Sequence, residues 1–142
     1  MNKQAMKLIK KFEGFSPTPY ACAGGYWTVG WGHRLGPNEP RGPLTYAQAK
    51  ELLARDVERC ERAIRKLVHV PLDTHQEAAL ISFVFNVGAA AFQRSTLRMK
   101  VNREEHHDVP AEFHRWVWCK GRKLPGLVVR RQAEAQWYGG RG

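Results

Sequence analysis

The sequence predicts an α+β fold, a mainly helical domain with one small β-hairpin near its N-terminus. Apolar residues recur at helical spacing through most of the 142-residue chain. Between residues 27 and 31, by contrast, large apolar side chains alternate with Thr28 and Gly30, and a Gly24-Gly25 pair precedes them. This is the pattern of a strand that follows a tight turn. The length corresponds to one domain, residues 1–142, that can bury a sizeable core.

The first helix is predicted over about the first dozen residues, where Leu8, Ile9 and Phe12 share one apolar face. Gly14 is its expected stop, so Glu13 lies at the helix C-terminus. The partial negative charge of a helix C-terminus and the flanking phenylalanines both favour the protonated form of this acid. Such a group suits proton donation at neutral pH.

Two capping boxes mark the starts of long helices. Thr45 and Gln48 open the longest predicted helix, which ends before Pro71. Thr74 and Glu77 open the next one, which is apolar almost all round and ends at Asn86-Val87-Gly88. An apolar surface on every side predicts a central, buried helix.

Three further helices are predicted in the C-terminal third. Ser95 begins the first of them. Pro110 lies in the first turn of the second, which is expected to hold Trp116 and Val117. Pro125 starts the last helix.

Earlier in the chain, a glycine- and proline-rich loop divides a small N-terminal part, about residues 13–43, from a helical part, about residues 44–138. A cleft between the two parts is the expected substrate site.

The formal net charge of +10 and a pI near 10 predict attraction to an anionic partner. Nucleic acid, an acidic membrane surface and an anionic cell wall all qualify. No nucleic-acid-binding motif or contiguous basic arm favours nucleic acid, and no apolar run approaches the roughly 20 residues of a membrane helix. The N-terminal lysines are not followed by an apolar segment, so we expect no secretory signal and a product that first accumulates in the cytoplasm.

The sequence predicts no metal site and no cofactor. Cys22, Cys60 and Cys119 are odd in number and widely spaced, which favours free thiols in a reducing compartment. Cys60 lies on an apolar helix face and is expected to be a core residue. The adjacent pair His106 and His107 would point in different directions on a helix and so is a poor metal-binding pair.

Glu13 is followed after eight residues by Cys22, and Cys22 after five residues by Thr28, just before Gly30-Trp31-Gly32-His33. This spacing resembles the catalytic signature of the phage T4-type lysozymes, the glycoside hydrolase family 24 endolysins, in which Glu, Asp or Cys, and Thr form the catalytic group. The resemblance continues in order along nearly the whole chain, over residues 45–57, 76–88, 113–116 and 124–131.

The resemblance implies a lysozyme-like fold in which the long helix from Thr45 links two lobes. It implies that Glu13 is the general acid, that Cys22 replaces the more common aspartate as base or nucleophile, and that Thr28 orients a water or the thiol. Phe85 takes a position that lines the family's sugar site. Its neighbour Asn86 could either cap backbone carbonyls or reach into the cleft, and both are candidate substrate-binding residues.

The function implied by the resemblance is that of a bacteriolytic phage or prophage endolysin. Such an N-acetylmuramidase cleaves the β-1,4 bond between N-acetylmuramic acid and N-acetylglucosamine in peptidoglycan. We expect a monomer that depends on a holin for release to the wall and needs neither nucleic acid nor stable membrane insertion. The alternative is a catalytically silent, basic wall-binding domain on the same scaffold. His33 is expected to pack against the hairpin rather than to catalyse.

Overall fold

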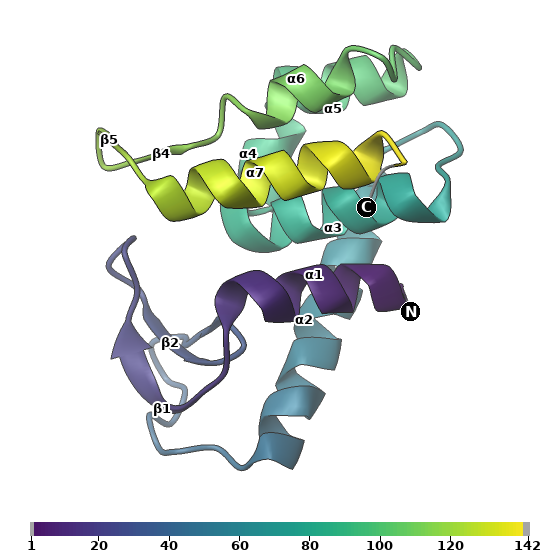
Figure 1. Cartoon of the computed structure of the whole chain (residues 1–142). Coiled ribbons are helices and arrows are strands. Elements are labelled where there is room, and N and C mark those ends of the chain that lie inside the picture. The colour runs from purple at the N-terminus through teal and green to yellow at the C-terminus, as the bar shows by residue number, and fades with distance from the viewer. Residues whose placement is uncertain (1, 141–142) are drawn as a thin grey trace.

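The computed structural model describes residues 2–140 and shows a mainly helical protein with small antiparallel sheets, as expected for the α+β class (Figure 1). The helices are α1 (Lys3–Glu13), α2 (Tyr46–Leu67), α3 (Thr74–Val87), α4 (Ala89–Gln93), α5 (Thr96–Asn102), α6 (Val109–Phe113) and α7 (Pro125–Tyr138). One sheet has the order β1 (Ser16–Ala21), β2 (Trp27–Gly30), β3 (His33–Arg34), and the other pairs β4 (Trp118–Cys119) with β5 (Arg122–Lys123). None of the helices within residues 2–140 has the length and apolar character needed to cross a membrane.

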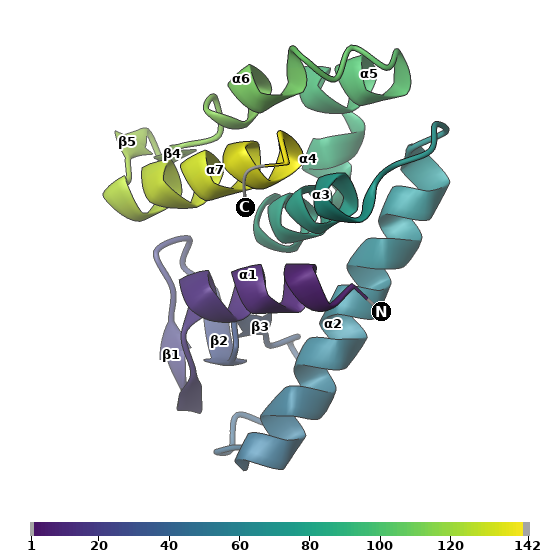
Figure 2. The ribbon, with the colours of Figure 1, turned by 45° about the vertical axis from the view of Figure 1, so that its right-hand side comes forward.

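Helix α3 is the centre of the core, as its apolar sequence predicts. Its side chains from Ala78 to Val84 are buried, and it packs against α1 on one side and α7 on the other (Figure 2). The ring of Phe83 meets three other aromatic rings edge-on, with centroids 5.4–6.3 Å apart. Such edge-to-face pairs add about 0.5–1.5 kcal/mol each to the stability that area burial provides. The end of α3 meets the sheet through Arg34 of β3, which donates to the Asn86 carbonyl at 3.2 Å.

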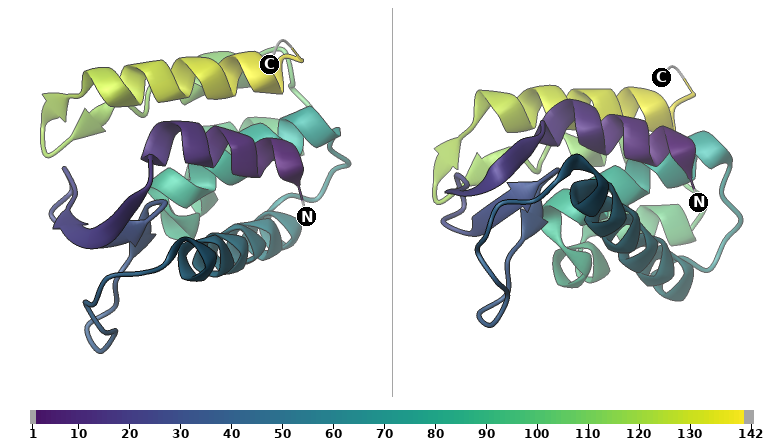
Figure 3. Two further views of the ribbon diagram at one scale, coloured as in Figure 1. Left: turned by 60° about the horizontal axis from the view of Figure 1, so that its bottom comes forward. Right: turned by 90° about the horizontal axis from the view of Figure 1, so that it is seen from below.

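The long helix α2 begins where the sequence predicts. The side chains of Thr45 and Gln48 each accept a hydrogen bond from the other's backbone N–H, which completes the capping box. The side of the molecule on which α2 and the three-stranded sheet lie is turned forward in Figure 3. Strand β2 packs directly against α2, so this helix supports the sheet.

Two expectations about helix boundaries are wrong. The second capping box is formed by Asp73 and Gln76, since Gln76 Oε1 accepts from the backbone N of Asp73 at 2.9 Å, whereas Thr74 already lies inside the helix. Helix α6 ends at Phe113, so Trp116 and Val117 lie beyond it and lead into β4. The β4–β5 hairpin was not predicted, because strands of two residues carry no alternating pattern.

The turn between β1 and β2 lies at the predicted glycine pair. The backbone N of Cys22 donates to the carbonyl of Tyr26 at 2.8 Å, and the N of Gly25 donates to the carbonyl of Cys22 at 2.8 Å. Gly25 has φ of +86°, a backbone conformation that favours glycine. The turn therefore presents Cys22 at its first corner.

His33 joins the sheet to α2 and does not line the cavity described below. Its Nδ1 lies 2.8 Å from Asp56 Oδ2 of α2, and its Nε2 lies 2.7 Å from Glu39 Oε2. The hydrogen bond with Asp56 outweighs burial and, with help from Glu39, raises the pKa of His33. We expected His33 to pack against the hairpin. Instead, its ring is bonded to Asp56 of α2 and to Glu39 of the loop.

These ion pairs predict a stability that depends on pH. A raised folded-state pKa gives a stabilisation that is complete below the unfolded pKa of about 6.5 and is lost as pH rises through the folded-state value. Replacing His33 with Asn should lower the free energy of unfolding by about 1.5–3 kcal/mol at pH 6, and by less at higher pH. Urea unfolding between pH 5.5 and 9 measures this difference, and a pH-independent loss would contradict the assignment.

Candidate active site

All five residues that the sequence marks as candidates line one cavity of about 340 Å³. They are Glu13, Cys22, Thr28, Phe85 and Asn86. The cavity lies where the end of α1, the turn between β1 and β2, the end of α3 and the β4–β5 hairpin meet. Residues that are up to 73 positions apart in this set therefore share one solvent-accessible space.

Glu13 is the last residue of α1, and its side chain is only 18% exposed. Gly32 packs against this carboxyl group: it has φ of +71°, and a side-chain carbon there would collide with Glu13 Oε1. The second oxygen, Oε2, accepts a hydrogen bond from Arg130 Nη1 of α7 at 2.5 Å. The acid is thus fixed between a glycine and a buried guanidinium, rather than in the purely apolar setting that its neighbours suggest.

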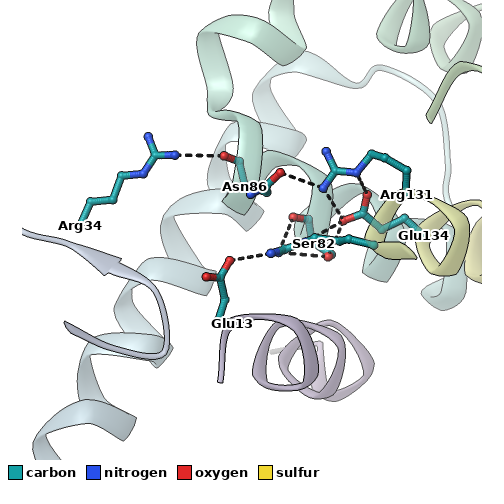
Figure 4. A network of polar contacts seen from close by, with 7 residues as sticks. Glu13, Arg34, Ser82, Asn86, Arg131 and Glu134 are labelled. Carbon is teal, nitrogen blue, oxygen red and sulfur yellow. Dashed lines mark hydrogen bonds and ion pairs between the residues drawn. The ribbon is translucent and has the colours of Figure 1, made fainter. Parts of the chain in front are cut away.

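Arg130 belongs to a buried polar network on α7 and α3. Figure 4 shows this network, with Ser82, Arg131 and Glu134 labelled. Arg130 donates from Nη2 to the Ser82 carbonyl at 3.1 Å and from Nε to Glu134 Oε2 at 3.3 Å, and Ser82 Oγ donates to the same oxygen at 2.6 Å. Arg131 Nε lies 2.8 Å from Glu134 Oε1. Burial lowers the pKa of Arg131 to about 10 and raises that of Glu134.

Arg130 joins Glu13, at the cavity, to the rest of this network. Arg130 is 5% exposed and bonds both Glu13 and Glu134, so the network holds the side chain of Glu13 in place. Sequence reasoning missed this network, although the adjacent arginines and the four-residue spacing of Arg130 and Glu134 on a helix were available signals.

Cys22 carries a free thiol at the corner of the turn between β1 and β2. Burial alone would raise its pKa. The backbone of Tyr26 and the backbone of Gly24 form hydrogen bonds that favour the thiolate, Thr28 adds another when its hydroxyl turns to the sulfur, and Arg34 adds a positive charge. Together they lower the pKa of Cys22 below its ordinary value, so the thiolate is more accessible near neutral pH than the residue type suggests.

Thr28 is 3% exposed and has one hydroxyl proton to give. In the structure this proton points to the Tyr26 carbonyl, with Thr28 Oγ1 donating at 3.1 Å. The same hydroxyl can turn to the sulfur when Cys22 is ionised, because hydroxyl groups rotate to suit their partners. Thr28 can therefore respond to the charge of Cys22, and its oxygen can still accept a hydrogen bond.

Asn86 does not cap the helix with its side chain. Its Oδ1 accepts from Arg131 Nη2 at 2.9 Å, and its backbone carbonyl accepts from Arg34 Nη2 of β3 at 3.2 Å (Figure 4). Phe85, next to it, is partly buried: it packs against the core and also lines the cavity. Of the two alternatives that the sequence leaves open for Asn86, the structure thus places it at the cavity.

The β4–β5 hairpin closes one side of the cavity and contributes residues that sequence reasoning missed. Trp118 lines the cavity with 62% of its surface exposed. Cys119 Sγ reaches across to the Ala23 carbonyl at 3.8 Å. Within residues 2–140, no group of three or more His, Cys, Asp or Glu side chains could hold a metal ion.

A second cavity, of about 410 Å³, lies between the 36–44 loop and α2. Apolar residues such as Leu35, Leu44 and Leu52 contribute to its lining. None of the five candidate residues lines it.

Solved structures define the class to which the fold belongs. The muramidase domain of SpmX from Asticaccaulis excentricus has a TM-score of 0.84 and 31% identity, covering 96% of this chain and 95% of that chain. An endolysin from Escherichia coli O157:H7 phage FAHEc1 has a TM-score of 0.84 and 30% identity, covering 96% and 90%. The fold is therefore the lysozyme-like α+β fold, as the sequence predicts.

The sequence comparisons identify the family. The phage lysozyme family model matches residues 10–134. The endolysin of Acyrthosiphon pisum secondary endosymbiont phage 1 is 37% identical over 138 residues, 94% of each chain. The SAR-endolysin of Escherichia phage Mu is 37% identical over 122 residues, covering 86% of this chain and 71% of that protein. The chain belongs to the phage lysozyme family and is a hydrolase of the lysozyme class.

Proposed function

We propose that the chain is an endolysin whose cavity hydrolyses the β-1,4 bond between N-acetylmuramic acid and N-acetylglucosamine in bacterial peptidoglycan. One observation carries the proposal: an acid, an activated thiol and a buried hydroxyl line a single cavity of about 340 Å³. Hydrolysis of a glycosidic bond requires an acid for the leaving oxygen and a second group that activates water or attacks the sugar. The family membership supports the substrate class.

In the proposed reaction Glu13 protonates the departing glycosidic oxygen. Arg130 binds Oε2, so the proton is carried by Oε1, the oxygen next to Gly32. Because Arg130 and Gly32 fix the rotamer, the acid is already oriented before a substrate arrives, and positioning of this kind lowers the barrier to proton transfer.

Cys22 and Thr28 are proposed to act on the attacking water. The Cys22 thiolate accepts a proton from water while the water oxygen bonds to the anomeric carbon and the glycosidic bond breaks. Thr28 accepts a hydrogen bond from this water or donates one to the thiolate. The lowered pKa of Cys22 supports the assignment, because a neutral thiol is a poor base.

Phe85 and Asn86 are proposed to bind the glycan beside the reacting bond. The net charge of +10 favours approach to an anionic wall polymer. We further propose that the protein acts as a monomer and first accumulates in the host cytoplasm, from which a holin releases it to the peptidoglycan.

Analysis of reaction products tests the function. Purified peptidoglycan is digested with the protein, the new reducing ends are reduced with borohydride, and the sugars are hydrolysed and identified. Muramitol is the expected product. Glucosaminitol would contradict the assigned bond, and the absence of any new reducing end would favour the silent wall-binding alternative.

Expression alone in a Gram-negative host tests the release step. The cells are expected to remain intact until chloroform or a co-expressed holin opens the inner membrane, and then to lyse within minutes. The optical density of the culture measures this. Prompt lysis without either treatment would contradict holin-dependent release while leaving the muramidase assignment untouched.

A further inference from the structure

The amide of Asn86 has an orientation that its partner determines. A guanidinium group has hydrogen-bond donors and no acceptor. Since Arg131 Nη2 lies 2.9 Å from this amide, the atom facing it must be the oxygen, Oδ1. The NH₂ group of Asn86 is consequently the end that turns away from Arg131.

Arg131 cannot easily release this amide. Its side chain is fully buried, it is paired with Glu134 at 2.8 Å, and its guanidinium lies 5.1 Å from the centre of the Phe83 ring. Moving a buried charge away from its partner costs about 3–5 kcal/mol. The buried Arg131 therefore fixes the orientation of the Asn86 side chain.

The two N–H donors of Asn86 Nδ2 have no hydrogen-bond partner within the part of the chain that the structure describes. The backbone carbonyl of the same residue is already used by Arg34 at 3.2 Å. Asn86 lines the cavity next to Phe85 and Val87, which offer apolar surface. The cavity therefore has an uncharged hydrogen-bond donor, Asn86 Nδ2, beside the apolar surface of Phe85 and Val87.

We infer that Asn86 recognises the acetamido group of the bound glycan and that Arg131 is the positioning residue that sets the donor toward it. An acetamido group combines a carbonyl acceptor with a methyl group, so it complements both parts of this surface. A free amine on the sugar carries donors and a positive charge at neutral pH, and it would face N–H groups with no acceptor. This inference rests on the proposed glycan substrate and makes Asn86 a determinant of selectivity for N-acetylated over N-deacetylated strands.

A pair of matched substrates tests the selectivity. One is peptidoglycan whose glucosamine residues carry free amines, and the other is the same preparation after re-N-acetylation with acetic anhydride. The ratio of kcat/KM for the acetylated over the deacetylated form should be about 10 or more for the wild type, the size expected when donors of a binding site lose their acceptor.

Asn86→Asp should reverse the polarity of the site. Its carboxylate can pair with Arg131 and turns acceptor oxygens toward the cavity, so the kcat/KM ratio should fall at least about 10-fold. Asn86→Ala removes the donor without adding charge and should lower the ratio by a smaller factor. Asn38→Asp makes the same chemical change on the exposed 36–43 loop and serves as the control that should keep the wild-type ratio.

Binding in an inactive background separates this inference from the catalytic roles. Co-sedimentation of Glu13→Gln and of Glu13→Gln/Asn86→Asp with both peptidoglycans gives a binding ratio without turnover. Loss of the preference for acetylated strands in the double variant supports the inference. A preference that survives both Asn86 substitutions overturns it, even if the wild type is a fully active muramidase; a wild type that cleaves neither substrate removes the proposed function instead.

Substitutions of Arg131 test whether its hydrogen-bond donors fix the orientation of the Asn86 side-chain amide. Arg131→Lys keeps a donor-only cation and should preserve the binding ratio, whereas Arg131→Gln can both donate and accept and should lower it. Thermal unfolding is measured for both variants. A structural role alone would change the melting temperatures of both while leaving the preference for acetylated strands the same, and that result would overturn the positioning role.

Discussion

Glu13→Gln is expected to lower the hydrolysis of peptidoglycan by about 10²–10⁴-fold, the usual contribution of a positioned general acid. The amide cannot transfer a proton to the glycosidic oxygen. It nevertheless retains an oxygen that accepts from Arg130, whose Nη1 lies 2.5 Å from the native carboxylate. The rate of clearing of a peptidoglycan suspension measures the loss.

The control for this prediction is a Glu→Gln substitution at Glu58, a residue to which no catalytic role is assigned. Glu58 lies on the exposed face of α2 in an i,i+4 pair with Arg62, with a side chain 59% exposed, so Glu58→Gln should keep wild-type activity. Circular dichroism and co-sedimentation with peptidoglycan check that Glu13→Gln is folded and binds. A folded Glu13→Gln protein with more than about a tenth of wild-type activity would rule out Glu13 as the acid.

Substitutions at Cys22 are expected to change both the rate and its pH dependence. Cys22→Ala should lose most of the activity, because Thr28 is not a base and Glu13 is assigned to the leaving oxygen. Cys22→Asp should retain activity, since a carboxylate is a competent base. Initial rates of clearing between pH 4 and 9 are the measurement.

The sign of the pH effect follows from which form is active. The thiolate acts as base, so wild-type activity should rise with pH through the folded-state pKa of Cys22, which the hydrogen bonds and Arg34 place below the ordinary thiol value. In Cys22→Asp the rising limb should move to acid pH, because a carboxylate ionises near about 4. Arg34→Gln removes one of the lowering influences and should shift the limb of the wild type to higher pH.

Alkylation gives an independent check on the thiol. In a background with Cys60 and Cys119 replaced, iodoacetamide should abolish activity at a rate that rises over the same pH range as catalysis. Cys60 is buried and its pKa is raised to about 12, mainly by burial, so its replacement removes a core thiol rather than a competing nucleophile. If Cys22→Ala is as active as the wild type, Cys22 is a bystander and another group handles the water.

Local sequence rules account for three features of the fold and for the proximity of three candidate site residues. The helix that ends at Gly14, the capping box at Thr45 and the turn at Gly24-Gly25 are decided by contacts within a few residues, and the structure has all three. Because Glu13, Cys22 and Thr28 lie on either side of that turn, their spacing in the sequence largely fixes their proximity. The resemblance to a known family supplied the proposed roles.

Local rules were insufficient at two helix boundaries. Asp73 competes with Thr74 for the cap of α3, and the extended backbone of Asp73 decides in its favour. Trp116 and Val117 read as a continuation of α6, but the chain leaves the helix after Phe113 to form the β4–β5 hairpin. That hairpin closes the cavity through Cys119, and its two-residue strands give no signal that sequence periodicity can detect.

The fold class, the order of most elements and the short-range group of candidate catalytic residues could be predicted from the sequence. The tertiary structure alone decided the surroundings of that group: the ion pair of Glu13 with Arg130 joins residues 117 positions apart, and the contact of Asn86 with Arg131 joins residues 45 apart. Such pairs form only because α3 packs between α1 and α7 and buries the charges together. Propensity and periodicity act over one or two turns of chain, whereas a buried charge selects its partner from whatever the packing of the whole molecule brings within reach.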